Sequence, residues 1–303
     1  MALPRSDAVA STARRLLSGS PDGRPGWVRA LDKPGDPGWF GAGSAVWAVH
    51  GSLATLVGGV RALLLQAAHP LALAGVLDHS DYREDPLGRL QRTNMFITTT
   101  TYGSTEQALG AVRLVRTVHG SVVGNAPDGR AYAANDPHLL AWVHVALTDS
   151  MLRAAQRYST TPVDADAYVA GMAVVADALG AEDPPRTEAE LAARLSAFGP
   201  ELVGDERTRE VVAFLRRPPL PVATLPVYTV LERAAEDLLD EPTAALLGLR
   251  RPPGVVRAAQ RQTTAALLGA LGVVLGPSSP AERASLVRAA QWRAARLDAR
   301  APS

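Results

Sequence analysis

Helix start signals recur along the chain from Ser44 to its end, and this pattern restricts the fold more than any other feature. Asp85-Pro86 and Asp136-Pro137 each place proline directly after an N-capping carboxylate. They predict helices that run to about Tyr102 and about Tyr158. No segment shows the strict apolar–polar alternation that marks a half-buried strand. We therefore predict an all-α protein, most simply a single large helical domain of roughly ten helices.

Two capping boxes support the same interpretation. Ser104 with Gln107 begins one helix, and Thr187 with Glu190 begins another. Apolar residues dominate from Ala45 to Val76, but His50, Arg61, Gln66 and His69 interrupt them, so we expect a buried helical hairpin rather than a membrane span. The glycines of GSLATLVGGVR follow no strand and indicate close helix packing instead of a nucleotide loop. Later helices are predicted at 163–179, 187–198, 205–215, 226–239, 255–274 and 280–299.

Residues 1–43 differ from the rest of the chain. GSPDGRPGW and DKPGDPGWFGAG are rich in glycine and proline and predict turns and coil. We expect a loose N-terminal arm that Trp27, Trp39 and Phe40 attach to the body, followed by a helical domain over 44–303.

Composition excludes several classes of function. The chain has no cysteine, which removes disulfides, cysteine-ligated zinc, iron–sulfur clusters and thiolate-bound haem. A metal would have to be held by His, Asp, Glu or Tyr. The net charge is +1 and no long basic tract occurs, so we expect no nucleic-acid partner. The N-terminus lacks the apolar core of a signal peptide, and we expect a cytoplasmic protein without stable membrane insertion.

All six histidines lie between Ser44 and Met151, so any proton or metal chemistry is expected in the first half. His119 falls on one helical stripe with Ala108, Val112, Val115 and Val122, and His144 shares a face with Leu140, Ala141, Leu147, Thr148 and Met151. Arg89, Arg92, Thr93 and Phe96 lie together on the helix that Pro86 begins. Taken alone, a histidine on an apolar face is also typical of a structural core residue. Likewise, two arginines and a threonine on one helical face are typical of a solvent-exposed surface. His69 could cap a helix end, His79 lies in a predicted loop, and His138 is expected to be exposed.

Other catalytic patterns are missing from the sequence. It contains no HExxH motif, no Glu-x-x-His pair of the di-iron type, no GxSxG elbow, no P-loop and no GxGxxG after a strand.

The motifs VWAVHGSLATLVGGVRALLLQAAHP, DHSDYREDPLGRLQRT, VHGSVVG and YAANDPHLLAWVHVALTDS occur in this order. In this order they resemble the bacterial haem oxygenase family related to latex-clearing protein (rubber oxygenase), which includes the MpaB-type oxygenases. The resemblance covers about Gly43 to Leu249 and is strongest between Ala45 and Ser150. It implies an all-helical fold, a b-type haem, and use of dioxygen to cleave carbon–carbon double bonds in isoprenoid chains.

The resemblance assigns the cofactor-binding residues. His119 matches the histidine that binds the haem iron on its proximal side, which agrees with an imidazole on an apolar stripe. Arg89 and Thr93 match an Arg-x-x-x-Thr pair beside the haem, where a guanidinium suits a propionate.

On the distal side the chain departs from the family. Arg92 stands where some latex-clearing proteins have a lysine, and a guanidinium is a very poor iron ligand, although it can orient dioxygen by hydrogen bonding. His69 and His144 fall near positions that line the distal side and are candidates for proton transfer. A distal catalytic glutamate has no clear counterpart.

The resemblance leads to one main expectation and two alternatives. The main one is a haem b-dependent oxygenase that acts with dioxygen on a hydrophobic, isoprenoid- or lipid-like small molecule, with His69, His144 and Arg92 as catalytic residues. The alternatives are a non-catalytic haem-binding or sensing protein, whose second axial position His144 or His69 occupies, and a helical family member that has lost haem. The sequence indicates neither the substrate nor the oligomeric state.

Overall fold

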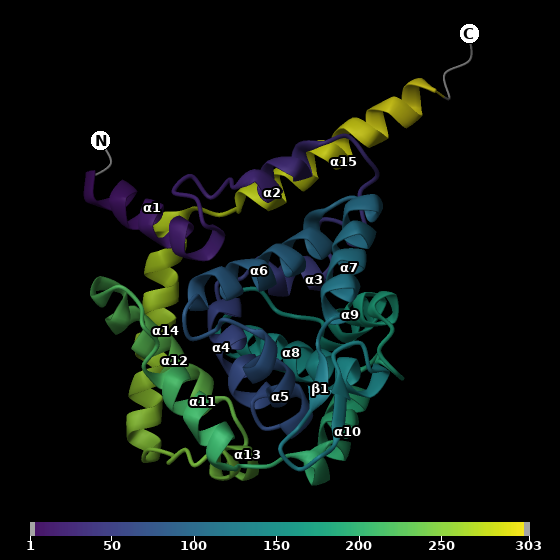
Figure 1. The fold of residues 1–303 in the computed structure, drawn as a ribbon. Coiled ribbons are helices and arrows are strands. Elements are labelled where there is room, and N and C mark those ends of the chain that lie inside the picture. Colours follow the sequence, from purple (N-terminus) through teal and green to yellow (C-terminus); the bar gives the residue numbers. More distant parts are fainter. Residues whose placement is uncertain (1–3, 300–303) are drawn as a thin grey trace.

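A computed structural model describes residues 4–299, and over this range the protein is predominantly α-helical, as the sequence predicts. It has 15 α-helices in this range rather than roughly ten, since several of them span only four to six residues. Figure 1 shows the helices packed around α8, with a small two-stranded ribbon at one edge. The α-helices are α1 (Pro4–Ser18), α2 (Gly26–Arg29), α3 (Ala45–His50), α4 (Thr55–Gln66), α5 (Pro70–His79), α6 (Pro86–Tyr102), α7 (Thr105–His119), α8 (Pro137–Tyr158), α9 (Ala165–Leu179), α10 (Glu188–Ala197), α11 (Glu206–Arg216), α12 (Leu225–Asp237), α13 (Glu241–Leu246), α14 (Gly254–Leu275) and α15 (Pro280–Asp298).

The caps explain where these helices begin. Asp85 accepts a hydrogen bond from the Gly88 N–H at the start of α6, and Asp136 does the same for His138 and Leu139 at the start of α8. Both bonds of the Ser104–Gln107 capping box are present at α7. At α10 only half of the predicted box forms. Thr187 accepts from the Glu190 N–H, but the Glu190 carboxylate accepts from the Arg186 N–H instead of the cap residue.

The helix α8 is the centre of the fold, and α4 lies directly against it. Gly58 permits this contact, because a Cβ atom there would lie 2.9 Å from Met151 Sδ and 3.0 Å from the Ser150 carbonyl oxygen. The glycine-containing segment is therefore a helix-packing site, as predicted. A buried ion pair adds to the interface, with Arg61 Nη2 2.7 Å from Asp149 Oδ2.

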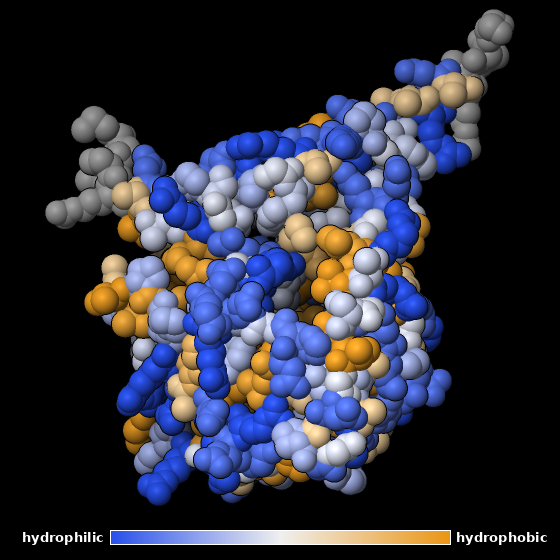
Figure 2. Space-filling view, viewed as in Figure 1, coloured by the Kyte–Doolittle hydropathy of each residue, from blue (hydrophilic) through white to orange (hydrophobic). Residues whose placement is uncertain are grey.

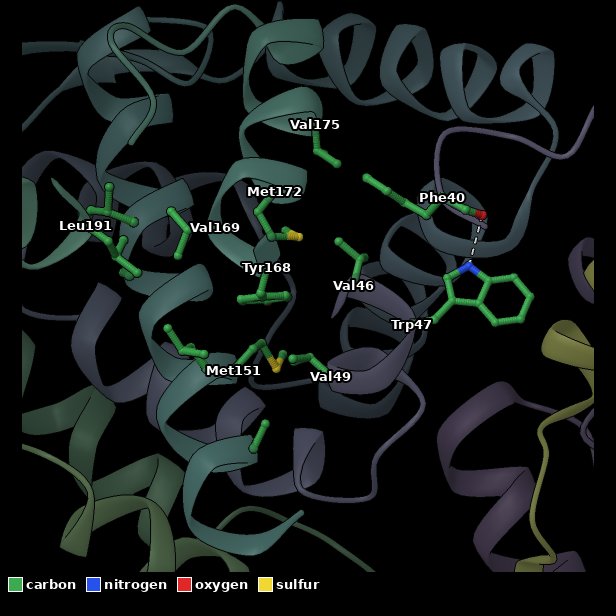
Figure 3. Close-up of a cluster of buried hydrophobic side chains, with 14 of the residues drawn as sticks. Phe40, Val46, Trp47, Val49, Met151, Tyr168, Val169, Met172, Val175 and Leu191 are labelled. Atoms are coloured by element: carbon green, nitrogen blue, oxygen red, sulfur yellow. Dashed lines mark hydrogen bonds between the residues drawn. The ribbon is translucent and has the colours of Figure 1, made fainter. Parts of the chain in front are cut away.

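The N-terminal arm is attached through aromatic residues, as expected. Phe40 is buried in the core beside α3 and α9, and its carbonyl oxygen accepts a hydrogen bond from Trp47 Nε1 at 3.0 Å (Figure 3). Trp27 and Trp39 pack against the same core. The arm is not coil throughout, however, because Pro4–Ser18 forms α1, which packs on α6 and α14.

Three further expectations are corrected by the structure. The apolar run around His69 is not a hairpin, since α4 and α5 meet at 104°. A short antiparallel ribbon, β1 (Val123–Asn125) with β2 (Ala131–Ala133), forms where no strand was expected, because the APDG turn closes it. His79 is the last residue of α5 rather than a loop residue. The division of the chain at residue 44 stays a prediction.

Within residues 4–299, no single helix has both the length and the apolar character needed to cross a membrane. Two bent pairs, α4 with α5 and α14 with α15, satisfy length and composition only when each pair is taken together.

Candidate functional site

The candidate site lies between α6 and α7. These helices follow one another across a turn at Gly103 and Ser104, and Figure 1 shows them diverging from it. In the space-filling view the surface between them is hollowed, and hydrophobic residues lie along the α7 side (Figure 2). Leu114, Val118 and Val123, on or just after α7, are each more than half exposed. We call this feature the α6–α7 hollow.

His119 ends α7, and its position follows from the predicted stripe. Ala108 and Val112 of the stripe are fully buried, and the stripe becomes half-buried at Val115 and His119. The Nδ1 atom of His119 is buried and has no hydrogen-bond partner among residues 4–299. Burial lowers the pKa of His119, an effect that the nearby backbone of Ala134 partly offsets. The ring is therefore neutral near pH 7, which is the form that binds metals.

Arg89 is in the first turn of α6 and is half-buried. Its Nη1 atom donates to Ser80 Oγ at 2.5 Å, and no carboxylate forms an ion pair with it in the described part of the chain. Burial, together with the charge of Arg92, lowers the pKa of Arg89. A partly desolvated guanidinium without a counter-ion is poised to bind an anionic group.

The other two predicted residues of this helix are exposed. Arg92 Nη1 lies 3.4 Å from Asp85 Oδ2, and about 61% of the Arg92 side chain is accessible. Thr93 donates its hydroxyl hydrogen to the Arg89 carbonyl at 3.2 Å. Arg89, Arg92 and Thr93 thus share the N-terminal half of α6, but only Arg89 is drawn inward.

His144 lies in the middle of α8 and is 7% exposed. The predicted inward face of this helix is confirmed, because Leu140, Ala141, Thr148 and Met151 are buried beside it. Its Nε2 atom is buried and has no hydrogen-bond partner in the described chain. Burial lowers the pKa of His144 to about 4, opposed by the charge of Asp177.

His69 differs from His119 and His144 because both of its ring nitrogens have hydrogen-bond partners. It caps the start of α5, where its Nδ1 accepts from the Ala72 N–H at 3.4 Å, and its Nε2 lies 3.3 Å from Glu201 Oε2. Its ring is fully buried next to Trp142 and Phe198. Both ring nitrogens of His69 therefore already have protein partners.

The remaining histidines also have partners. His50 Nδ1 lies 2.7 Å from Thr101 Oγ1, and His79 Nε2 lies 3.2 Å from the Val123 carbonyl oxygen. His138 is half-buried rather than exposed, because Glu182 and Glu201 hold its two nitrogens at 2.6 and 2.9 Å. Of the six histidines, only His119 and His144 keep a buried nitrogen without a partner among residues 4–299.

These features fit a haem. A haem iron needs only one imidazole from the protein, and His119 could supply it. An unpartnered buried nitrogen costs about 1–3 kcal/mol, and ligation would remove that cost at His119. Arg89 would match a propionate, and the apolar wall of α7 would match the porphyrin.

Sequence reasoning missed Ser80, whose hydroxyl contacts Arg89 on α6, and Tyr132, whose hydroxyl contacts Asp78 on α5. Ser80 sits in the quoted motif DHSDY, but nothing in the local pattern shows that its hydroxyl meets Arg89. Such contacts join residues from separate elements, and periodicity carries no information on them.

Comparison with known proteins gives one match. A family model described as the catalytic domain of ER-bound oxygenase mpaB/B′ and rubber oxygenase matches residues 47–271. No curated protein and no solved structure matches the chain. The family match includes α6, α7 and α8, which carry Arg89, His119 and His144 respectively. Because it spans most of the 303 residues, the chain belongs to the family of mpaB and rubber oxygenase catalytic domains.

Proposed function

We propose that the protein is a haem b-dependent oxygenase that uses dioxygen to oxidise a hydrophobic small molecule. The observation that carries this proposal is the pairing of His119 with Arg89. Within residues 4–299, His119 has a buried ring nitrogen without a hydrogen-bond partner, and Arg89 has a guanidinium without a carboxylate partner. They stand on the two helices that flank the α6–α7 hollow.

In this proposal His119 holds the iron and Arg89 binds a propionate, with Thr93 on the next turn of the same helix. Haem supplies the redox chemistry with dioxygen, which no side chain of this protein can perform. The protein provides ligation, polarity and access. Its neutral His119 needs no deprotonation before it binds, because burial already disfavours the imidazolium.

We assign proton transfer primarily to His144. Its Nε2 has no hydrogen-bond partner within residues 4–299, and its pKa of about 4 keeps the ring neutral near pH 7, so it would hold a proton only transiently while passing it on. Arg92 is exposed and can donate hydrogen bonds to dioxygen or substrate. His69 would take part through Glu201, which it contacts together with His138.

The substrate class follows from the surface around the hollow. Leu114 and Val118 of α7, and Val123 just after it, expose apolar area, and burying such area against a hydrophobic ligand is favourable by about 25 cal/mol per Å². An isoprenoid- or lipid-like molecule fits this wall, and oxidative cleavage of a carbon–carbon double bond is the reaction we expect.

The decisive experiment is a haem titration of the purified protein followed by absorbance. Wild type should bind haem, whereas His119→Ala should lose binding and keep its helical circular dichroism. His138→Ala is the matched control, because this half-buried histidine lies between two carboxylates and should not affect haem. If His144→Ala abolished binding and His119→Ala did not, the iron ligand would be on α8. A chain that takes up no haem at all would be a helical member without the cofactor.

One observation favours a second candidate function, haem sensing without catalysis. The unpartnered Nε2 of His144 could serve as a second axial ligand if it approached the iron. The oxygenase proposal predicts a mainly high-spin ferric spectrum that responds to added imidazole. A low-spin spectrum that becomes high-spin in His144→Ala or His69→Ala would favour the sensor.

A further inference from the structure

Three consecutive residues, the last two of α5 and its C-cap, make side-chain contacts with two neighbouring elements. Asp78 and His79 are the last residues of α5, and Ser80 follows as its C-cap. Their contacts lead in opposite directions, one to α6 and the other to the β-ribbon that follows α7.

The first contact fixes Arg89. The Ser80 hydroxyl accepts a hydrogen bond from Arg89 Nη1 at 2.5 Å, and it is the only side chain with a hydrogen bond to this guanidinium within residues 4–299. The long arginine side chain would otherwise populate several rotamers, since Arg carries about 2 kcal/mol of rotamer entropy. Ser80 therefore holds the guanidinium in one orientation.

The second contact fixes Tyr132 of β2, which is 5% exposed. Its hydroxyl donates to Asp78 Oδ2 at 2.7 Å. His79 Nε2 lies 3.2 Å from both the Tyr132 hydroxyl oxygen and the Val123 carbonyl oxygen. Because a carbonyl oxygen can only accept, Nε2 carries the hydrogen, and His79 binds both strands of the ribbon at once.

The ribbon continues directly to His119. The Ala134 N–H donates to the Val122 carbonyl at 2.9 Å, and the Val122 N–H donates to the His119 carbonyl at 3.1 Å. Val122 also faces α5, because a Cβ on Gly75 would lie 3.4 Å from Val122 Cγ1. A shift of Tyr132 would thus be transmitted through two hydrogen bonds to the end of α7.

We propose that Asp78, His79 and Ser80 are positioning residues that fix Arg89 relative to His119. They do so from one short segment, the C-terminal end of α5 with its C-cap, so that Arg89 and His119 keep their spacing without touching one another. The link to the cofactor rests on the proposed function, whereas the link between α5, α6 and the ribbon does not.

Hydrogen exchange of the cofactor-free protein tests the link itself. Ser80→Ala should speed amide exchange in the first turns of α6 by about tenfold, the loss expected for one hydrogen bond to a charged group, and leave the ribbon unchanged. Ser80→Thr, which keeps the hydroxyl, should restore protection. Tyr132→Phe should show the reverse pattern, with faster exchange around 119–134 and no change at α6.

Two controls match the substitutions. Ser159→Ala removes a hydroxyl that accepts only from the Thr161 N–H in a remote turn, and Tyr158→Phe removes a buried hydroxyl without a hydrogen-bond partner in the described chain. Neither should change exchange at α6 or the ribbon. Equal exchange in wild type and Ser80→Ala, or one pattern common to Ser80→Ala and Tyr132→Phe, would overturn the proposal.

Haem dissociation then tests the link to the cofactor. Ser80→Ala should lose haem about tenfold faster than wild type, and the double variant with Arg89→Ala should lose it no faster than Arg89→Ala alone. Additive effects would show that Ser80 does not act through Arg89. If wild type bound no haem, the proposed function would fail, and the exchange experiment would still decide whether the α5 segment holds both elements.

Discussion

At the scale of single residues, side chains that look equivalent in the sequence differ in burial and in their hydrogen-bond or ion-pair partners. Six histidines occur in the first half of the chain, and four of them have hydrogen-bond partners in the protein, on both ring nitrogens for His50, His69 and His138 and on Nε2 for His79. His119 and His144 each keep a buried nitrogen free among residues 4–299. Arg89 and Arg92, three positions apart, differ in the same way, since one is drawn inward and the other pairs with Asp85 at the surface.

This difference predicts unequal effects on haem binding. Arg89→Ala should weaken haem affinity by about 1.5–3 kcal/mol, the range for a hydrogen bond to a charged group. Arg92→Ala should cost less than about 1 kcal/mol, because its exposed ion pair is screened by solvent. Titration of both variants with haem measures the two effects. Equal losses would mean that Arg89 makes no stronger contact with haem than an exposed arginine does.

A second prediction at this scale concerns Glu232. Burial, followed by hydrogen bonding to Glu236, raises the pKa of Glu232 to about 8 from the ordinary 4.5. Between these values the folded state holds a proton that the unfolded state has released, so the free energy of unfolding falls as the pH rises. Glu232→Gln should remove this fall and stabilise the protein by on the order of 1–3 kcal/mol at pH 8 relative to wild type.

Urea unfolding at pH 5 and pH 8 measures the effect. Glu210→Gln is the control, because this carboxylate is exposed and pairs with Arg83 at the surface. An equal decline in stability for wild type and Glu232→Gln over that window would contradict the assignment.

At the scale of elements, the contact between α4 and α8 depends on a glycine that has no side chain. Gly58 of α4 touches the backbone of α8, whereas its neighbour Gly59 has no atom within 4 Å of the position that a Cβ would occupy. Two adjacent glycines in one helix thus have opposite roles, which depend only on the direction in which each faces.

This pair makes a matched test. Gly58→Ala should destabilise the protein by about 1–3 kcal/mol, because the Ser150 carbonyl cannot move without shifting α8. Gly59→Ala should be neutral or stabilise by up to about 1 kcal/mol, since alanine favours the helix. Thermal unfolding of the two variants distinguishes them. A larger loss for Gly59→Ala would mean that α4 presents its other face to α8.

At the scale of the whole molecule, the C-terminal helix ties the N-terminal arm to the body. Arg288 of α15 is fully buried and donates to three backbone carbonyls, those of Leu31, Asp36 and Tyr102, at 3.0, 2.9 and 2.6 Å. The first two lie in the arm and the third ends α6. One side chain near the end of the chain therefore joins the arm to a wall of the candidate site.

Arg288→Met should keep the side-chain volume but leave these carbonyls without a donor. We expect a loss of about 3 kcal/mol or more in unfolding free energy, and faster proteolysis of residues 33–44. Arg293→Met, at an exposed position of the same helix, should change neither. Unchanged proteolysis in Arg288→Met would show that the aromatic contacts of Phe40 and Trp47 hold the arm without α15.

The sequence alone determined the helical class, most helix boundaries and the residues that face inward on α7 and α8. These features are local, because capping, proline placement and the 3.6-residue period involve neighbours in the chain. It also led to the family through motifs that include His119 and Arg89. It could not determine the bend between α4 and α5, the ribbon after α7, or the partners of the six histidines.

Those features were decided by tertiary structure, since they depend on which distant groups meet. The ring nitrogens of His69 have Glu201 and the α5 backbone as hydrogen-bond partners. Within residues 4–299, His119 and His144 each have one buried nitrogen without a partner. The roles of Ser80 and Tyr132 are visible only in the structure, where they contact Arg89 and Asp78 on other elements. A hydrogen bond between such residues leaves no periodic trace in the sequence, because its geometry arises only when the helices pack.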